Sequence, residues 1–277
     1  MSMRSTVSKL IGAALSGIAL SGCAARYGLL AQAPGFERSF ISAGRFTLTS
    51  YSRFSKPGEP VRVYIEGDGR AWVSRTRLSD NPTPAEPLVM ELAARDPAAN
   101  VAYIARPGQY TATGAPGCDA SYWDNRRFSE EVIAAVNSAV DAVLKRSGSD
   151  KIELVGYSGG GAVAVLVAAR RGDIISLRTL AGNLDPEAVN KYHKVSPLEG
   201  SLNPMDYAEK IKDIPQRHFV GSKDKVVPPF VARSFSEREG DGGQERITVV
   251  EGAAHSKGWL ENWERLLSVP VSAGGSK

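Results

Sequence analysis

Histidine is scarce in this chain, with three among 277 residues. These are His193, His218 and His255, and their spacing is not that of metal ligands, so we expect no zinc site. Basic residues neither gather into a stripe nor alternate with aromatic residues, which gives nucleic-acid binding little support. Internal repeats, coiled-coil heptads and low-complexity linkers are also lacking. The length therefore predicts one domain with a substantial core.

The apolar stretch near the N-terminus is too short to span a bilayer. It covers residues 10–20, follows a basic segment containing Arg4 and Lys9, and leads into Leu-Ser-Gly-Cys at 20–23. A positive segment, a short apolar run and small residues are typical of a signal peptide. The ending resembles a bacterial lipobox. This resemblance implies that residues 1–22 are a lipoprotein signal peptide and that the Cys23 thiol receives a diacylglycerol anchor.

The residue after the anchor cysteine is Ala24 rather than aspartate, which by resemblance to lipoprotein sorting signals favours the outer membrane. We therefore expect a lipid-anchored protein of the bacterial cell envelope, on the outer membrane and facing the periplasm. Cysteine is scarcer still, with two residues in all. With Cys23 lipidated, Cys118 has no partner within the chain, which excludes a disulfide framework. A buried thiol and an intermolecular bridge both remain open for it.

The sequence Gly-Tyr-Ser-Gly-Gly at 156–160 carries the chemistry. It follows a strand-like apolar run at 152–155 and precedes a helical run of small residues at 161–169. In a G-x-S-x-G turn the serine sits on a tight strand-to-helix bend, where flanking side chains would collide. This context predicts that Ser158 is a nucleophile. It also places the Gly159 N–H at a helix N-terminus, where it would stabilise an oxyanion.

Partners for the serine occur in the order acid, then histidine. His255 follows a strand-like run at 246–250, on the loop where a general base is expected. Asp224 follows the preceding strand and is expected to orient the His255 ring, with Asp185 as the rival acid. His218 falls inside a strand and is expected to be packed, whereas His193 is expected at the surface.

These motifs together resemble the α/β-hydrolase superfamily. The resemblance implies an α/β fold with a mostly parallel, doubly wound sheet of about eight strands, in three α/β/α layers with a small lid or none. We expect the tether over residues 23–43, the hydrolase domain over 44–269 and a C-terminal tail over 270–277. The polar segment at 183–212 lacks a long apolar helix, which argues against a large lipase-type lid.

The second oxyanion donor is expected on the loop after an early strand. The strand is residues 61–65, and the loop reads Glu66-Gly67-Asp68-Gly69-Arg70 where the family often has His-Gly. By register the donor is the Asp68 backbone N–H, with Gly69 as the alternative. Two carboxylates would then lie near a site for negative charge, so one is expected to turn away or to pair with Arg70.

Aromatic residues provide candidates for a substrate pocket. They are Tyr157, Trp72, Tyr110, Tyr122 and Trp123, of which the last three lie on the long loop 106–127. The alternative is that the loop aromatics only anchor the loop to the body.

Elsewhere the pattern predicts an antiparallel pair from residues 44–51 and 60–65. Helices are expected at 83–95 and 128–146, with a buried strand at 101–105 between them. Strands that alternate with helices are typical of a doubly wound sheet, whose sites lie at the carboxyl ends of the strands.

The prediction is a serine esterase that acts through an acyl-enzyme on Ser158, with thioesters as a further substrate class. The substrate is expected to be a small-molecule or lipid ester, and no cofactor or metal is required. Two alternatives stay open, a non-catalytic envelope lipoprotein that uses the fold for binding and an acyltransferase.

Overall fold

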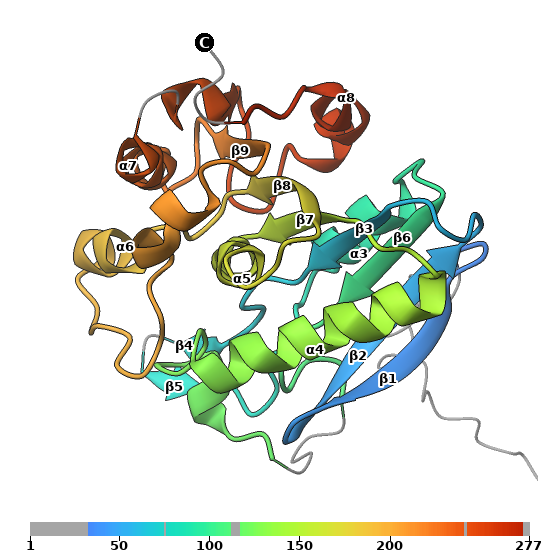
Figure 1. Ribbon diagram of the computed structural model, residues 1–277. Coiled ribbons are helices and arrows are strands. Elements are labelled where there is room, and N and C mark those ends of the chain that lie inside the picture. Colours follow the sequence, from blue (N-terminus) through green and yellow to red (C-terminus); the bar gives the residue numbers. More distant parts are fainter. Residues whose placement is uncertain (1–32, 75, 112–116, 241–242, 274–277) are drawn as a thin grey trace, which may run out of the picture.

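One sheet of eight strands organises the part of the chain that the computed structural model describes, residues 33–74, 76–111, 117–240 and 243–273 (Figure 1). The strand order is β1-β2-β6-β3-β7-β8-β9-β10. Strands β3 and β6 to β10 run parallel, whereas β2 is antiparallel to both of its neighbours. The bounds are β1 Glu37–Ala43, β2 Phe46–Phe54, β3 Val61–Ile65, β6 Asn100–Ile104, β7 Ile152–Tyr157, β8 Ile174–Leu180, β9 Gln216–Gly221 and β10 Ile247–Val250.

Helices cover both faces of the sheet (Figure 1). Helices α4, α5 and α7 pack on one face, and α3 and α8 pack on the other. Their bounds are α3 Leu88–Ala94, α4 Glu130–Ser147, α5 Gly159–Ala168, α6 Pro186–His193, α7 Phe230–Glu239 and α8 Trp263–Ser268. Short 3₁₀ helices span Ala120–Trp123, Pro204–Tyr207, Glu209–Ile211, Gly243–Arg246 and Leu260–Asn262. The mostly parallel three-layer arrangement predicted from the sequence is confirmed.

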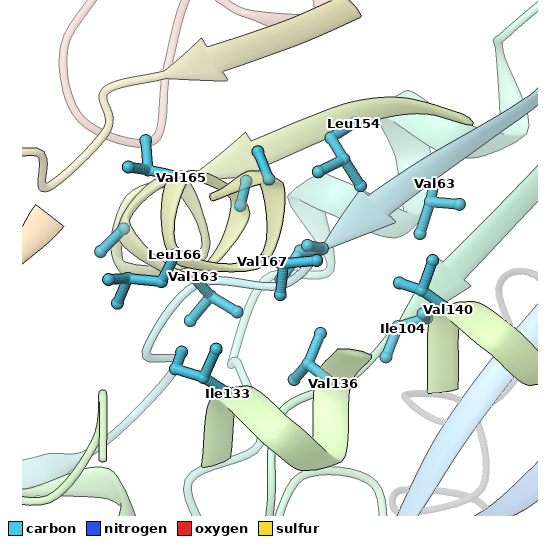
Figure 2. Close-up of a cluster of buried hydrophobic side chains, with 14 of the residues drawn as sticks. Val63, Ile104, Ile133, Val136, Val140, Leu154, Val163, Val165, Leu166 and Val167 are labelled. Atoms are coloured by element: carbon cyan, nitrogen blue, oxygen red, sulfur yellow. The ribbon is translucent and has the colours of Figure 1, made fainter. Parts of the chain in front are cut away.

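Alternation along the strands divides the core into two layers. In β3, Val63 and Ile65 face the α4–α5 side, and Tyr64 between them faces the α3–α8 side. Figure 2 shows valines of α4 and α5 facing Val63, Ile104 and Leu154 of the sheet. Helix α5 is buried along its whole length, because it packs on β7 and β8 and is flanked by α4 and by the 3₁₀ helix Pro204–Tyr207. Its N-terminus is thereby fixed against the end of β7.

The N-terminal strands pair differently from the prediction. Residues 44–51 and 60–65 were expected to pair with each other, but β2 pairs with β1 and β6, and β3 pairs in parallel with β6 and β7. The physical reason is that β1, Glu37–Ala43, supplies the antiparallel partner through a tight turn at 44–45. This strand lies within residues 23–43, which were assigned to the tether, so the sheet begins earlier than predicted.

Three further segments differ from expectation. The helix predicted at 83–95 spans only Leu88–Ala94, because prolines at 82, 84 and 87 keep the preceding residues extended. A small hairpin of β4, Trp72–Ser74, and β5, Arg77–Leu78, was not predicted. Ser272, in the predicted tail, forms an antiparallel bridge with Gln216 of β9.

The predicted signal peptide and Cys23 lie outside the described residues. Among the residues that are described, no helix combines the length and the apolar character needed to cross a membrane.

Candidate active site

Ser158 sits on a sharp turn between β7 and α5. Its backbone has φ 52° and ψ −122°, a conformation that residues other than glycine rarely adopt. Gly156 and Gly160 are needed here because of close backbone contacts. A Cβ on Gly156 would lie 2.4 Å from the Gly160 carbonyl oxygen, and one on Gly160 would lie 2.3 Å from that of Ile65. The predicted strand–turn–helix context of the serine is therefore present.

His255 and Asp224 complete a hydrogen-bonded line with this serine. Nε2 of His255 lies 3.0 Å from Ser158 Oγ, and Nδ1 lies 2.9 Å from Asp224 Oδ2. The other carboxylate oxygen, Oδ1, accepts the N–H groups of Val226 at 2.8 Å and Val227 at 2.9 Å. With the Nδ1 proton facing the carboxylate, Nε2 is left to accept the serine proton. The structure thus brings together the three side chains that the sequence singled out.

The main chain of His255 is fixed as well as its ring. Its carbonyl oxygen accepts hydrogen bonds from Tyr157 Oη at 3.0 Å and from Trp259 Nε1 at 2.8 Å. The Tyr157 ring lies against the imidazole, with ring centroids 5.3 Å apart. Tyr157 immediately precedes Ser158. Its contacts with His255 therefore link the serine turn to the histidine loop.

The loop after β3, residues 66–70, lies directly against the serine turn. A Cβ on Gly67 would stand 3.3 Å from Ser158 Cβ. Gln109 Nε2 donates to the Gly67 carbonyl at 2.9 Å, which holds the loop from outside. Gly159 is the first residue of α5, so its N–H has no partner within the helix. The N–H groups of Gly159 and Asp68 therefore belong to adjoining backbone segments beside the nucleophile.

The two carboxylates of this loop take different environments. Glu66 points inward, fully buried, and accepts from Gly67 N–H at 2.9 Å and Tyr103 Oη at 2.9 Å. Burial raises the pKa of the Glu66 carboxyl to about 7, against the opposing effects of these bonds and the charge of Arg106. Asp68 stays at the site and forms ion pairs with Arg106 and Arg127. Of the two expected arrangements the first is present, because Glu66 turns away from the site, and Asp68 pairs with Arg106 and Arg127 rather than with Arg70.

A cleft of about 590 Å³ opens over the serine. Ser158, His255, Asp68, Tyr157 and Trp72 all line it, so two of the aromatic candidates lie at the site. Its remaining lining residues are Glu66, Gly69, Arg70, Ala71, Pro84, Ala85, Glu86, Leu88, Arg127, Val226 and Ser256.

The three aromatic candidates on the 106–127 loop point into the body of the protein. Tyr122 packs edge-on against Phe46 at 4.8 Å, and Trp123 Nε1 donates to the Ser79 carbonyl at 2.9 Å. Tyr110 is 2% exposed and packs against Tyr103. These residues anchor the loop, which was the alternative left open by the sequence.

The other residues that the sequence singled out make contacts outside the hydrogen-bonded line of Ser158, His255 and Asp224. His218 is buried in β9 with Nδ1 2.9 Å from Thr179 Oγ1, and His193 is exposed, as predicted. Asp185, the rival acid, caps α6 through the Ala188 N–H and accepts from Ser234.

Burial, reinforced by the charge of Asp119, raises the pKa of the Cys118 thiol to about 11. Among the described residues no cluster of three or more potential ligands could hold a metal ion.

Sequence reasoning missed the residues that hold the loop 66–70 in place. These are Tyr103, Arg106 and Gln109, which lie at the end of β6 or just after it. The available signal was that a polar Arg-Pro-Gly-Gln segment directly follows a buried strand, because such strand ends gather at the active edge of a parallel sheet.

No protein-family model and no curated protein sequence matches this chain. Solved structures do match. Est1E from Butyrivibrio proteoclasticus is similar with a TM-score of 0.58 at 16% identity, covering 83% of this chain and 97% of that chain. The Pyrococcus furiosus esterase Pf2001 gives 0.56 at 15%, covering 84% and 90%. An alpha-beta serine hydrolase homologue from Coxiella burnetii gives 0.55 at 16%, covering 83% and 95%. The chain has the α/β-hydrolase fold.

Proposed function

We propose that this protein is a serine hydrolase that cleaves a carboxylic ester or thioester through an acyl-enzyme on Ser158. The observation that carries the proposal is the continuous hydrogen-bonded line from Asp224 through His255 to Ser158 Oγ. Such a line activates a serine hydroxyl, because the imidazole accepts its proton while the carboxylate stabilises the resulting imidazolium.

In the proposed reaction, His255 removes the Ser158 proton as Oγ attacks the acyl carbonyl. The carbonyl oxygen becomes an oxyanion, which the N–H groups of Gly159 and Asp68 would stabilise. His255 then protonates the leaving alcohol or thiol as the acyl–oxygen or acyl–sulfur bond breaks. A water molecule, deprotonated by the same imidazole, attacks the acyl-enzyme and releases the acid and the free serine. No step requires a metal or an organic cofactor.

Esters are the favoured substrate class for two reasons. The similar structures Est1E and Pf2001 are esterases, which supports the same bond type here. The cleft is also open to solvent beside Trp72 and Val226, which are 42% and 49% exposed. Such a mouth suits a substrate with an apolar part, either a small-molecule ester or a lipid ester.

Active-site labelling tests the proposal. The full-length chain, purified in mild detergent, is treated with a fluorophosphonate probe beside Ser158→Ala and His255→Ala, and hydrolysis of p-nitrophenyl butyrate is measured in parallel. We expect labelling of the parent chain, none of Ser158→Ala, and at least roughly a hundredfold slower labelling of His255→Ala. A folded parent that neither labels nor hydrolyses would instead support a non-catalytic binding protein. Product analysis with added alcohols separates hydrolysis from acyl transfer.

We also propose that Cys23 carries a lipid anchor that holds the domain at the bacterial outer membrane. The support is the Leu-Ser-Gly-Cys sequence behind a short apolar run. Incorporation of an alkyne-labelled palmitate that is lost in Cys23→Ser, together with release of the chain from membranes, is the expected result. Equal incorporation by both chains would contradict it.

A further inference from the structure

A carboxylate stands where negative charge is least expected in the proposed reaction. A Cβ on Gly159 would lie 2.0 Å from Asp68 Oδ1, so the Asp68 carboxylate rests directly against the first residue of α5. That residue supplies one of the N–H groups proposed to bind the oxyanion. An uncompensated carboxylate at this position would oppose the development of negative charge, because the Asp68 side chain is only 18% exposed and water screens it weakly.

Two arginines from distant parts of the chain hold this carboxylate. Arg106 Nη1 lies 3.3 Å from Asp68 Oδ1, and Arg127 Nη1 lies 3.0 Å from Oδ2. We call these three residues the charge cluster. Its formal charge is one net positive, so the wall beside the serine becomes favourable to an oxyanion rather than hostile to it.

The two arginines differ in how deeply they are built into the fold. The Arg106 side chain is 4% exposed, donates to the Arg127 carbonyl and lies over the Phe128 ring at 5.5 Å. The Arg127 side chain is 18% exposed and lines the cleft itself. Its Nε donates to the Asp124 carbonyl at 2.7 Å, which fixes the guanidinium towards Asp68. Arg127 is therefore the member whose charge can be changed with least damage to the core.

We propose that Arg127 is a positioning residue of the oxyanion hole, which holds the Asp68 carboxylate in place and compensates its charge. This inference rests on the proposed function. It makes the Asp68 backbone N–H dependent on an ion pair formed 59 residues further along the chain. It also explains how a loop that contains a carboxylate, Asp68, can stabilise an oxyanion, for which a neutral loop would need no counter-ion.

Neutralising the charges of Arg127 and Asp68, singly and together, tests the inference on the full-length chain, with p-nitrophenyl butyrate as substrate. Arg127→Gln leaves the carboxylate facing the oxyanion with one counter-ion fewer. We expect kcat to fall by about 10–100-fold while KM changes by less than about threefold, since the effect arises in the transition state. Asp68→Asn combined with Arg127→Gln removes both charges, and kcat should recover to at least about five times that of Arg127→Gln. Arg127→Lys, which keeps the charge, should lie between Arg127→Gln and the parent.

Arg126→Gln is the matched control. Arg126 is the neighbouring residue, but it pairs with Glu131 on the outside of the protein, so kcat should stay within about twofold of the parent. Thermal unfolding of every variant separates loss of fold from loss of rate. A parent-like kcat in Arg127→Gln, or a double variant no faster than Arg127→Gln, would overturn the inference alone. A parent chain that fails to label with fluorophosphonate overturns the proposed function and this inference with it.

Discussion

Asp224 offers one carboxylate oxygen to His255 and commits the other to its own loop. Oδ2 lies 2.9 Å from His255 Nδ1, while Oδ1 accepts two backbone N–H groups. Asp224→Asn would keep the loop bonds through its amide oxygen and turn its NH₂ group towards Nδ1. The imidazole would then carry its proton on Nε2 and could not accept the serine proton. We expect kcat to fall on the order of 10³–10⁴-fold with little change in thermal unfolding.

Asp185→Asn is the control for this prediction. Asp185 was the rival acid from the sequence, but its carboxylate caps α6. We therefore expect near-normal hydrolysis and a loss of stability of at most about 1 kcal/mol. The opposite pattern, with activity lost only in Asp185→Asn, would mean that the acid has been assigned to the wrong residue.

Glycine is required at Gly160 in the serine turn and is dispensable at Gly172, in the loop between α5 and β8. Gly160→Ala would place its Cβ 2.3 Å from the Ile65 carbonyl oxygen, whereas Gly172→Ala meets nothing within 4 Å. We expect Gly160→Ala to lower the free energy of unfolding by about 1–3 kcal/mol and to reduce labelling of Ser158. Gly172→Ala should be neutral or stabilising by up to about 1 kcal/mol. Urea denaturation measures both, and equal values would refute the close-contact argument.

Glu66 makes stability depend on pH in an unusual direction. Its pKa is about 4.5 in an unfolded chain and is raised by burial to about 7 in the folded protein. The folded state therefore binds this proton more tightly, so its contribution is fully present below pH 4.5 and is lost as the pH rises through about 7. Glu66→Gln cannot lose a proton. Relative to the parent, it should gain up to about 3 kcal/mol of unfolding free energy between pH 4.5 and 8.

Chemical denaturation at a series of pH values checks the Glu66 prediction. The informative quantity is the difference between the two chains, because other groups titrate equally in both. A difference that stays constant from pH 4.5 to 8 would show that Glu66 is ionised throughout, with Arg106 as its counter-ion.

His218 should act with the opposite sign. Burial, with the charges of Arg246 and Arg217, lowers the pKa of its imidazole to about 3. The unfolded chain binds the proton near pH 6.5, so the stabilising contribution is present above that value and is lost as the pH falls towards 3. His218→Gln should flatten the acid side of the stability profile even if it lowers stability overall. An unchanged slope between pH 6.5 and 4 in this variant would contradict the prediction.

Local signals were sufficient to predict the strand–turn–helix at Ser158 and the two side chains, His255 and Asp224, that form a hydrogen-bonded line with it. The strand before Gly156 and the helix after Ser158 are both visible in adjacent sequence, and the order of Asp224 and His255 follows from chain direction. Ser158, Asp224 and His255 follow the carboxyl ends of β7, β9 and β10, so their place at one edge of the sheet follows from parallel packing.

Long-range pairing was not predictable in the same way. Arg106 and Arg127 reach Asp68 only because β6 is inserted between β2 and β3, and nothing in the sequence around residues 44–65 reveals that insertion. The orientation of the Tyr122 and Trp123 rings could not be predicted for a related reason. An aromatic residue in a long loop has the same composition whether its ring faces a pocket or the core, and only the packing partners decide.

The backbone conformation of Ser158, with φ 52°, bears on how this position can evolve. A non-glycine residue in this conformation costs on the order of 1–3 kcal/mol, which the surrounding fold must absorb. Ser158→Gly would relieve that strain and abolish the proposed reaction in one step. Selection for robustness and selection for turnover therefore oppose each other at this residue. A descendant that no longer needed the reaction would gain by losing its serine first.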